Sequence, residues 1–129
     1  MKRRYHKDVH YICKLSGIKK IEKVYGKLKN YDVVLTDERK KHIIERRGKD
    51  SLSILANLVN VIENYNYILA SENNCIKYIK MSEDNYALVI KLSLDNINEA
   101  NSILSAMKIN TKRAIKYASK DRVIESRIW

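Results

Sequence analysis

The hydrophobic and polar positions along this chain predict helices in its first half and strands in its second. The apolar run 33–35 leads into Thr36, a residue type favoured at helix N-caps, and then into two acidic residues that suit the positive end of a helix. We therefore expect a helix from Asp37 to about Arg47, ended by Gly48 in the C-cap position.

A second helix is expected from Ser51 to about Asn64, begun by Asp50 or Ser51 as N-cap. Its apolar residues recur at the spacing of a single helix face, which is the pattern of a helix packed on a flat layer. These residues are Leu52, Leu55, Leu58 or Val59, and Ile62.

Alternating apolar positions then predict about four strands. Segments 65–71 and 75–81 form an expected hairpin, and two further strands are expected at 86–94 and 102–109. In strand 86–94 the side that carries Leu88 is expected to face the core, which leaves Lys91 on the other side.

A short basic helix is expected from Asn110 to about Lys120, with three apolar residues facing inward: Ala114, Ile115 and Ala118. Helices followed by strands are the order of an α+β fold. The sequence thus predicts N-terminal helices packed on a mainly antiparallel sheet of about four strands.

The N-terminal part is predicted to stand outside this domain. Residues 1–17 are basic and are expected to form a leader or a linker, with a short helix that ends near Gly17. Segment 18–28 indicates a short strand or an amphipathic connector. A single α+β domain is therefore expected over residues 18–129.

The charge of the chain favours a polyanionic partner. Its 129 residues include 26 Lys and Arg against 15 Asp and Glu, which gives a net charge of +11. Nucleic acid is the first expectation and an anionic membrane the second. No apolar run approaches the ~20 residues of a membrane-spanning helix, and the N-terminus does not have the pattern of a signal peptide. We expect a cytoplasmic protein, or a domain delivered by another part of a larger polypeptide, with no membrane partner.

The cysteines and the N-terminal histidines do not predict a cofactor. Cys13 and Cys75 lie too far apart for a CxxC metal motif and give no disulfide framework. On a helix, His6, His10 and Cys13 would point the same way, but a fourth ligand is not evident. Surface histidines are the simpler interpretation, and we expect no metal.

The expected helix 37–47 carries the candidate chemistry. Arg39, His42 and Arg46 are spaced i, i+3 and i+7, so they share one face. A proton-transfer group beside fixed positive charge suits chemistry on a phosphodiester. A solvated basic helix, whose single histidine has no special role, is the alternative interpretation of this spacing.

The run VVLTDERKKHIIERR, followed by an apolar helix, strands and the late strand NSILSAMKI, resembles the superfamily of small ribonucleases that contains barnase, EndoU, colicin E5/D and RelE. The resemblance is closest to members found in phage and mobile elements and as C-terminal toxin modules. Their pattern has an Arg or Lys and a His on the first helix, and an Asn and a Ser or Thr on a late strand. Arg39, His42, Asn101 and Ser105 occupy the matching positions. Members often carry a second His one turn later, where this chain has Arg46 or Arg47.

The resemblance implies a metal-independent endoribonuclease that cleaves RNA, either tRNA or mRNA. The 2′-hydroxyl attacks the adjacent phosphorus and leaves a 2′,3′-cyclic phosphate and a 5′-hydroxyl. His42 would transfer a proton, Arg39 and Arg46 would hold the non-bridging oxygens, and Ser105 would hydrogen-bond the phosphate. A toxin of this kind implies an acidic immunity or antitoxin protein that covers its basic site.

Further residues are expected to bind the RNA: Lys91 and Lys108 on the late strands, Asn101, and Lys112, Arg113, Lys116 and Tyr117 near the C-terminus. Lys120 extends this basic surface, and Tyr117 is a candidate for stacking on a base. Exposed strand lysines also protect sheet edges, and basic helices occur in proteins that bind no RNA. A non-catalytic RNA- or DNA-binding module of the same fold is therefore an alternative function. A second alternative is a structural or phage-assembly protein whose charge maintains solubility or neutralises packaged nucleic acid.

Overall fold

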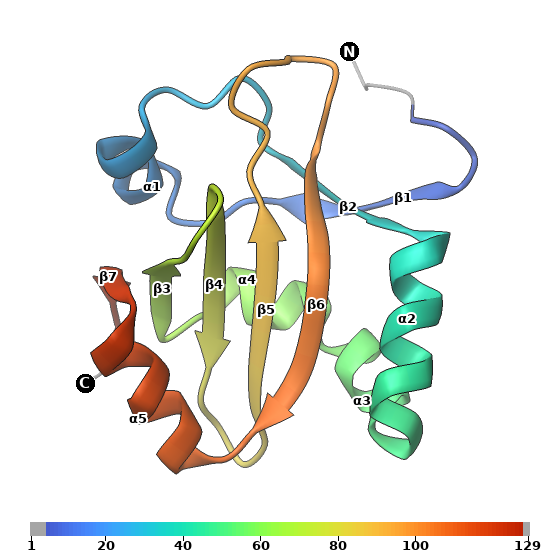
Figure 1. Cartoon of the computed structure of the whole chain (residues 1–129), viewed down its shortest axis with the longest axis vertical. Helices are drawn as coiled ribbons and strands as arrows, with labels where there is room; N and C mark the ends of the chain where they lie inside the picture. Colours follow the sequence, from blue (N-terminus) through green and yellow to red (C-terminus); the bar gives the residue numbers. More distant parts are fainter. Residues whose placement is uncertain (1–4, 128–129) are drawn as a thin grey trace.

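Seven strands form one mixed sheet in a computed structural model of the chain, which describes residues 5–127 (Figure 1). The strands are β1 (Val9–Lys14), β2 (Asp32–Thr36), β3 (Tyr67–Ala70), β4 (Cys75–Lys80), β5 (Asn85–Lys91), β6 (Asn101–Ile109) and β7 (Arg122–Ser126). The helices are α1 (Ile18–Tyr25), α2 (Asp37–Arg47), α3 (Ser51–Ala56), α4 (Leu58–Glu63) and α5 (Thr111–Lys120), with a 3-10 turn at Gly48–Asp50 between α2 and α3.

The strand order across the sheet is β1-β2-β6-β5-β4-β3-β7. Every neighbouring pair is antiparallel except β2 and β6, which run parallel over a short stretch. The α+β class predicted from the sequence is confirmed. The expected size of the sheet is wrong, because β1, β2 and β7 extend it beyond the four strands of the second half.

The N-terminal segment forms part of the sheet instead of a short helix. β1 pairs antiparallel with β2, and both Cys13 and Leu15 belong to the main hydrophobic core. Its aromatic and β-branched residues, including Tyr11 and Ile12, fit a pleated surface better than a helix. Residues 9–14 therefore belong to the domain, while residues 1–4 of the expected leader lie outside the described part of the chain.

Segment 18–28 is also different from its expected form, because α1 is a helix. Gly17 precedes it with a left-handed backbone (φ 68°). Ile18, Ile21 and Tyr25 recur at i, i+3 and i+7 and all pack in the main core, with Ile21 fully buried. The helical period of these three residues outweighs the partial alternation that suggested a strand.

α2 has the bounds that the sequence predicts. The hydroxyl oxygen of Thr36 caps it by accepting a hydrogen bond from the main-chain N–H of Arg39 at 3.1 Å. Gly48 ends it with a positive φ of 54°, which glycine adopts without the steric penalty of other residues.

The second expected helix is broken into α3 and α4 at Asn57, whose side-chain amide donates to the carbonyl of Ser53. Leu58 and Ile62 are buried and Leu55 packs against the main core, as predicted. Leu52 is 81% exposed, so its predicted place in the core is wrong. The buried residues of the two helices are Ser51, Ile54, Leu58, Val61 and Ile62.

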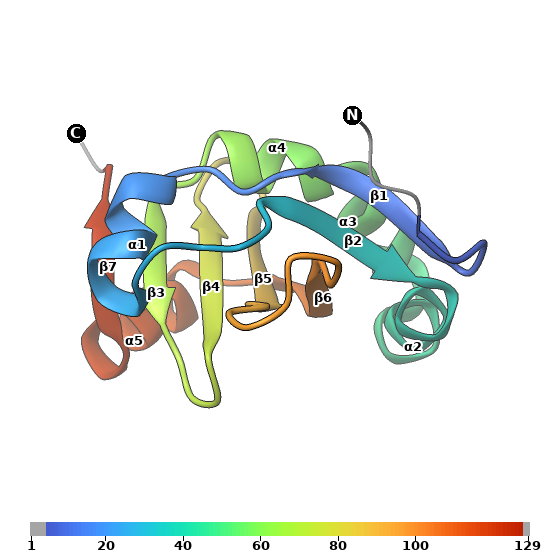
Figure 2. The same ribbon diagram turned by 90° about the horizontal axis from the view of Figure 1, so that it is seen from above.

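Figures 1 and 2 show α3 and α4 on one face of the sheet and α5 on the opposite face, with α2 beside β6. The main core lies under α3 and α4 and includes Leu88 and Ile90, as predicted. A smaller cluster lies under α5 and includes Leu69, Ile79 and Ala114. Ile115, which was expected to face inward, is 59% exposed. None of the helices in residues 5–127 is both long enough and apolar enough to span a membrane.

Candidate functional site

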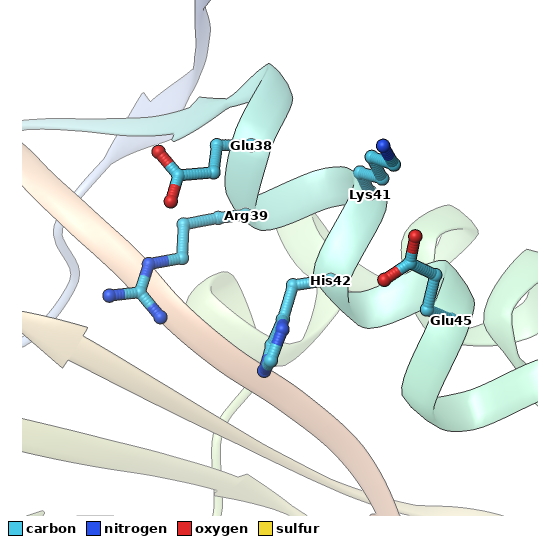
Figure 3. A pocket seen from close by; sticks show the side chains of 5 residues that line it. All are labelled: Glu38, Arg39, Lys41, His42 and Glu45. Carbon is cyan, nitrogen blue, oxygen red and sulfur yellow. The ribbon is translucent and has the colours of Figure 1, made fainter.

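α2 presents Arg39 and His42 side by side. Both side chains extend in the same direction from the helix, in front of the β6 ribbon in Figure 3, while Lys41 points elsewhere. His42 is exposed and Arg39 is partly buried. They line a surface hollow of about 210 Å³ together with Glu38, Lys41 and Glu45. The predicted pairing of an imidazole with a guanidinium on one helix face is therefore present.

The hollow is less cationic than the spacing Arg39, His42, Arg46 suggests. Glu38 and Glu45 lie at i−4 and i+3 from His42, so carboxylates flank the imidazole along the helix. Neither glutamate is among the site residues expected from the sequence, although their spacing from His42 is visible there. Arg46 is exposed on the last turn of α2 and does not line the hollow.

Ser105 lies on β6, the strand nearest to α2. It is partly buried and pairs with Val89 on β5. Arg47 joins α2 to β6 by donating a hydrogen bond from Nε to the carbonyl oxygen of Ala106 at 3.1 Å. The fold thus brings the strand of Ser105 beside the helix of His42, without a direct hydrogen bond between these two side chains within residues 5–127.

Asn101 has a structural position and is not available to RNA. Its side chain is fully buried, and its amide nitrogen donates to the carbonyls of Asn30 at 2.8 Å and Asp32 at 2.9 Å. Its amide oxygen accepts the N–H of Ser93 at 2.9 Å. The expected RNA-binding role of Asn101 is therefore wrong, because every polar group of its side chain is already bonded inside the protein.

The two strand lysines lie away from the α2 hollow. Lys91 is exposed at the end of β5 and donates to the carbonyl of Asn73 at 3.3 Å. Lys108 lies 3.8 Å from the carboxylates of both Asp50 and Asp84. These two carboxylates offset the charge of Lys108, which makes it a poor phosphate ligand.

The predicted C-terminal basic residues do come together, on α5. They line a second hollow, of about 480 Å³, whose residues are Asn110, Lys112, Arg113, Lys116, Tyr117 and Lys120. Arg113 Nε donates to the hydroxyl of Tyr117 at 3.0 Å, and Lys77 Nζ lies 4.3 Å from the centre of the Tyr117 ring. Because Lys77 covers one face of that ring, a base has at most the other face for stacking.

The N-terminal histidines do not form the helical ligand group considered from the sequence. His10 lies on β1, where its Nε2 is 2.5 Å from Oδ1 of Asp37 at the start of α2. Within residues 5–127, no group of three or more His, Cys, Asp or Glu residues is placed to hold a metal ion.

Comparison with family models finds no match to this chain, and comparisons with curated proteins and with solved structures find no significant one. The function must therefore be argued from the two hollows and their charges.

Proposed function

We propose that this chain is a metal-independent endoribonuclease, and that it acts as a toxin on tRNA or mRNA. The observation that carries the proposal is the pair Arg39 and His42, which extend side by side from α2 next to β6 in a protein of net charge +11. A fixed cation beside an imidazole, the side chain that most often transfers protons in enzymes, suits a phosphodiester substrate.

In the proposed reaction the 2′-hydroxyl of the RNA attacks the adjacent phosphorus and expels the 5′-oxygen. The guanidinium of Arg39 stabilises the charge that develops on the non-bridging oxygens. Two protons must move, one from the 2′-hydroxyl and one to the leaving oxygen. The α2 hollow offers His42 for one transfer and the carboxylates of Glu38 and Glu45 for the other.

Ser105 supports the proposal from the neighbouring strand, where this partly buried residue carries a hydroxyl that is a candidate donor to the scissile phosphate. Arg46 lies one turn beyond His42 on α2 and is a candidate for contact with the next phosphate along the RNA. If the protein is a toxin, its inhibitor is expected to present an acidic surface to this basic side.

The test is incubation of purified protein with total tRNA and with a generic mRNA in the presence of EDTA, followed by analysis of the product ends. Wild type is expected to leave 2′,3′-cyclic phosphate and 5′-hydroxyl ends. His42→Ala is expected to slow cleavage by at least about 100-fold, because general acid–base groups contribute factors of this size. His6→Ala is the matched control: it removes another exposed histidine, remote in sequence from α2, and should cleave like wild type.

Cleavage that persists in His42→Ala, or that disappears equally in His6→Ala, would contradict the role of His42. If wild type binds RNA and does not cleave it, the function is that of a non-catalytic RNA- or DNA-binding module. The observation that favours this second function is the basic hollow on α5, which requires no chemistry to bind phosphate.

A further inference from the structure

α5 carries an unusual concentration of positive charge. Its sequence, TKRAIKYASK, has four basic residues and no acidic one. Lys112, Lys116 and Lys120 follow one another at i, i+4 and i+8, so they form one line along the helix, and all three are exposed. Arg113 lies beside this line and lines the same hollow.

This arrangement works against the stability of the helix itself. Like charges at i and i+4 repel, and positive charge in the first turn opposes the helix dipole. Lys112 and Arg113 lie in that first turn, which has no acidic residue. α2 shows the favourable pattern, with acidic residues in its first turn and basic ones in its last. Helix stability therefore explains the charges of α2 and that of Lys120 in the last turn of α5. It does not explain Lys112, Arg113 and Lys116, whereas an anionic partner does.

The position of α5 relates it to the α2 hollow. Figure 2 shows α5 on the face of the sheet opposite to α3 and α4, and α2 at the other end of the same side, beside β6. The sheet between them is formed by β6, β5, β4 and β3 in that order. Three strand spacings of about 4.8 Å separate β6 from β3, or about 14 Å. A nucleic acid strand bound at the α2 hollow can reach α5 by crossing this part of the sheet.

We propose that α5 is a second RNA-binding surface, which holds phosphates of the substrate several nucleotides away from the bond that is cleaved at α2. This inference rests on the proposed function and specifies its substrate as single-stranded RNA long enough to contact both helices. A basic groove that follows the backbone is the usual way in which proteins hold a single strand. A trinucleotide is too short to use it.

The test measures binding in the His42→Ala background, so that no RNA is cut. Fluorescein-labelled oligouridylates of 3 and 12 nucleotides are titrated by fluorescence anisotropy at several salt concentrations. The test variant is Lys112→Gln/Lys116→Gln/Lys120→Gln on α5. The matched control is Lys19→Gln/Lys20→Gln/Lys23→Gln, which removes three exposed lysines from α1 and lowers the net charge by the same amount.

The α5 variant is expected to bind the 12-mer at least about 10-fold more weakly at low salt. The slope of log affinity against log salt should become shallower by about 2. Each phosphate contact contributes about 0.7 to the steepness of this slope for a single strand, and the variant loses three contacts. Binding of the 3-mer should change by less than about twofold, since it does not reach α5. The α1 control should alter 12-mer binding by less than about threefold, through net charge alone.

Unchanged 12-mer binding by the α5 variant would overturn the inference, and so would an equal loss on the 3-mer or in the α1 control. Absence of binding by the otherwise wild-type His42→Ala protein would overturn it as well. The proposed function is judged separately, by cleavage in EDTA. If wild type cleaves and the α5 variant binds the 12-mer normally, the inference on α5 alone fails. If the binding results hold and wild type does not cleave, the catalytic proposal alone fails.

Discussion

Arg47 on α2 and Ala106 on β6 are joined across 59 positions of sequence by a hydrogen bond from the guanidinium Nε to the main-chain carbonyl oxygen, at 3.1 Å. β2 pairs with β6 only at Asn101 and Ser102. Along the rest of β6, the edge that β2 leaves uncovered is contacted by α2. The bond to Ala106 therefore helps to hold α2, the helix that carries His42, beside the strand that carries Ser105.

Replacing Arg47 with alanine is expected to lower the free energy of unfolding by about 1–3 kcal/mol. The change removes a hydrogen bond from a charged donor and leaves the carbonyl of the buried residue Ala106 without this partner. Urea denaturation followed by circular dichroism measures the effect.

Arg46→Ala is the control, because it removes the same side chain from the neighbouring, exposed position. Its free energy of unfolding should stay within about 0.5 kcal/mol of wild type. RNA affinity should fall instead, if Arg46 contacts a phosphate. Equal losses of stability in both variants would show that helix α2 depends on total charge and not on the bond to Ala106.

Alkaline pH is expected to destabilise the protein through its buried thiol. Burial, with a smaller contribution from the negative charge of Glu63, raises the pKa of Cys13 from 9.0 to about 11. The native state thus retains a proton that the unfolded chain loses first. The stability that this group contributes is complete below pH 9 and is lost as the pH rises toward 11.

Urea midpoints at pH 8 and at pH 10.5 measure this loss. Cys13→Ala should lose less stability between the two pH values than wild type does, because the titrating thiol is absent. Some loss should remain, since burial also raises the pKa of Tyr78. An identical pH dependence in wild type and Cys13→Ala would exclude the thiol as its source.

Leu52 and Ile54 test the arrangement of α3. Ile54→Ala should lower the free energy of unfolding by about 2–5 kcal/mol, because Ile54 is 2% exposed and its removal leaves a cavity. Leu52→Ala should change it by less than about 0.5 kcal/mol, because Leu52 is 81% exposed. If Leu52→Ala lost more stability in urea than Ile54→Ala, Leu52 would face the core, as the sequence predicts, and the arrangement of α3 would be wrong.

That comparison shows where prediction from the sequence succeeds and where it does not. α2 was predicted correctly because its start and end depend on local signals, Thr36 and Gly48. In segment 51–64, Leu55, Leu58 and Ile62 face the core as predicted, whereas Leu52 does not. The break at Asn57 was not predicted, because the apolar stripe continues across it. β1 and β7 were missed because other elements separate them in sequence from their partners, β2 and β3, so no hairpin signal marks these segments.

In the site, too, the features that depend on local spacing were predicted and those that depend on distant segments were not. Arg39 and His42 lie together because helical spacing alone places them so, and the basic residues of α5 share a hollow for the same reason. The direction of a strand side chain depends on its neighbours in the sheet. The sequence placed Asn101 and Ser105 on one late strand, but it did not indicate that Asn101 points into a buried junction and Ser105 does not.

Asn101 joins three segments at that junction: the residues before β2, β2 itself and the loop after β5. Asn101→Ala is expected to lower the free energy of unfolding by about 2–4 kcal/mol, because two buried carbonyls and one N–H each lose the hydrogen bond to Asn101. RNA affinity per folded molecule should not change, since the side chain is fully buried. Asn98→Ala, at an exposed position in the same loop, is the control and should be nearly neutral. A fully stable Asn101→Ala that binds RNA more weakly would instead assign Asn101 to the RNA interface.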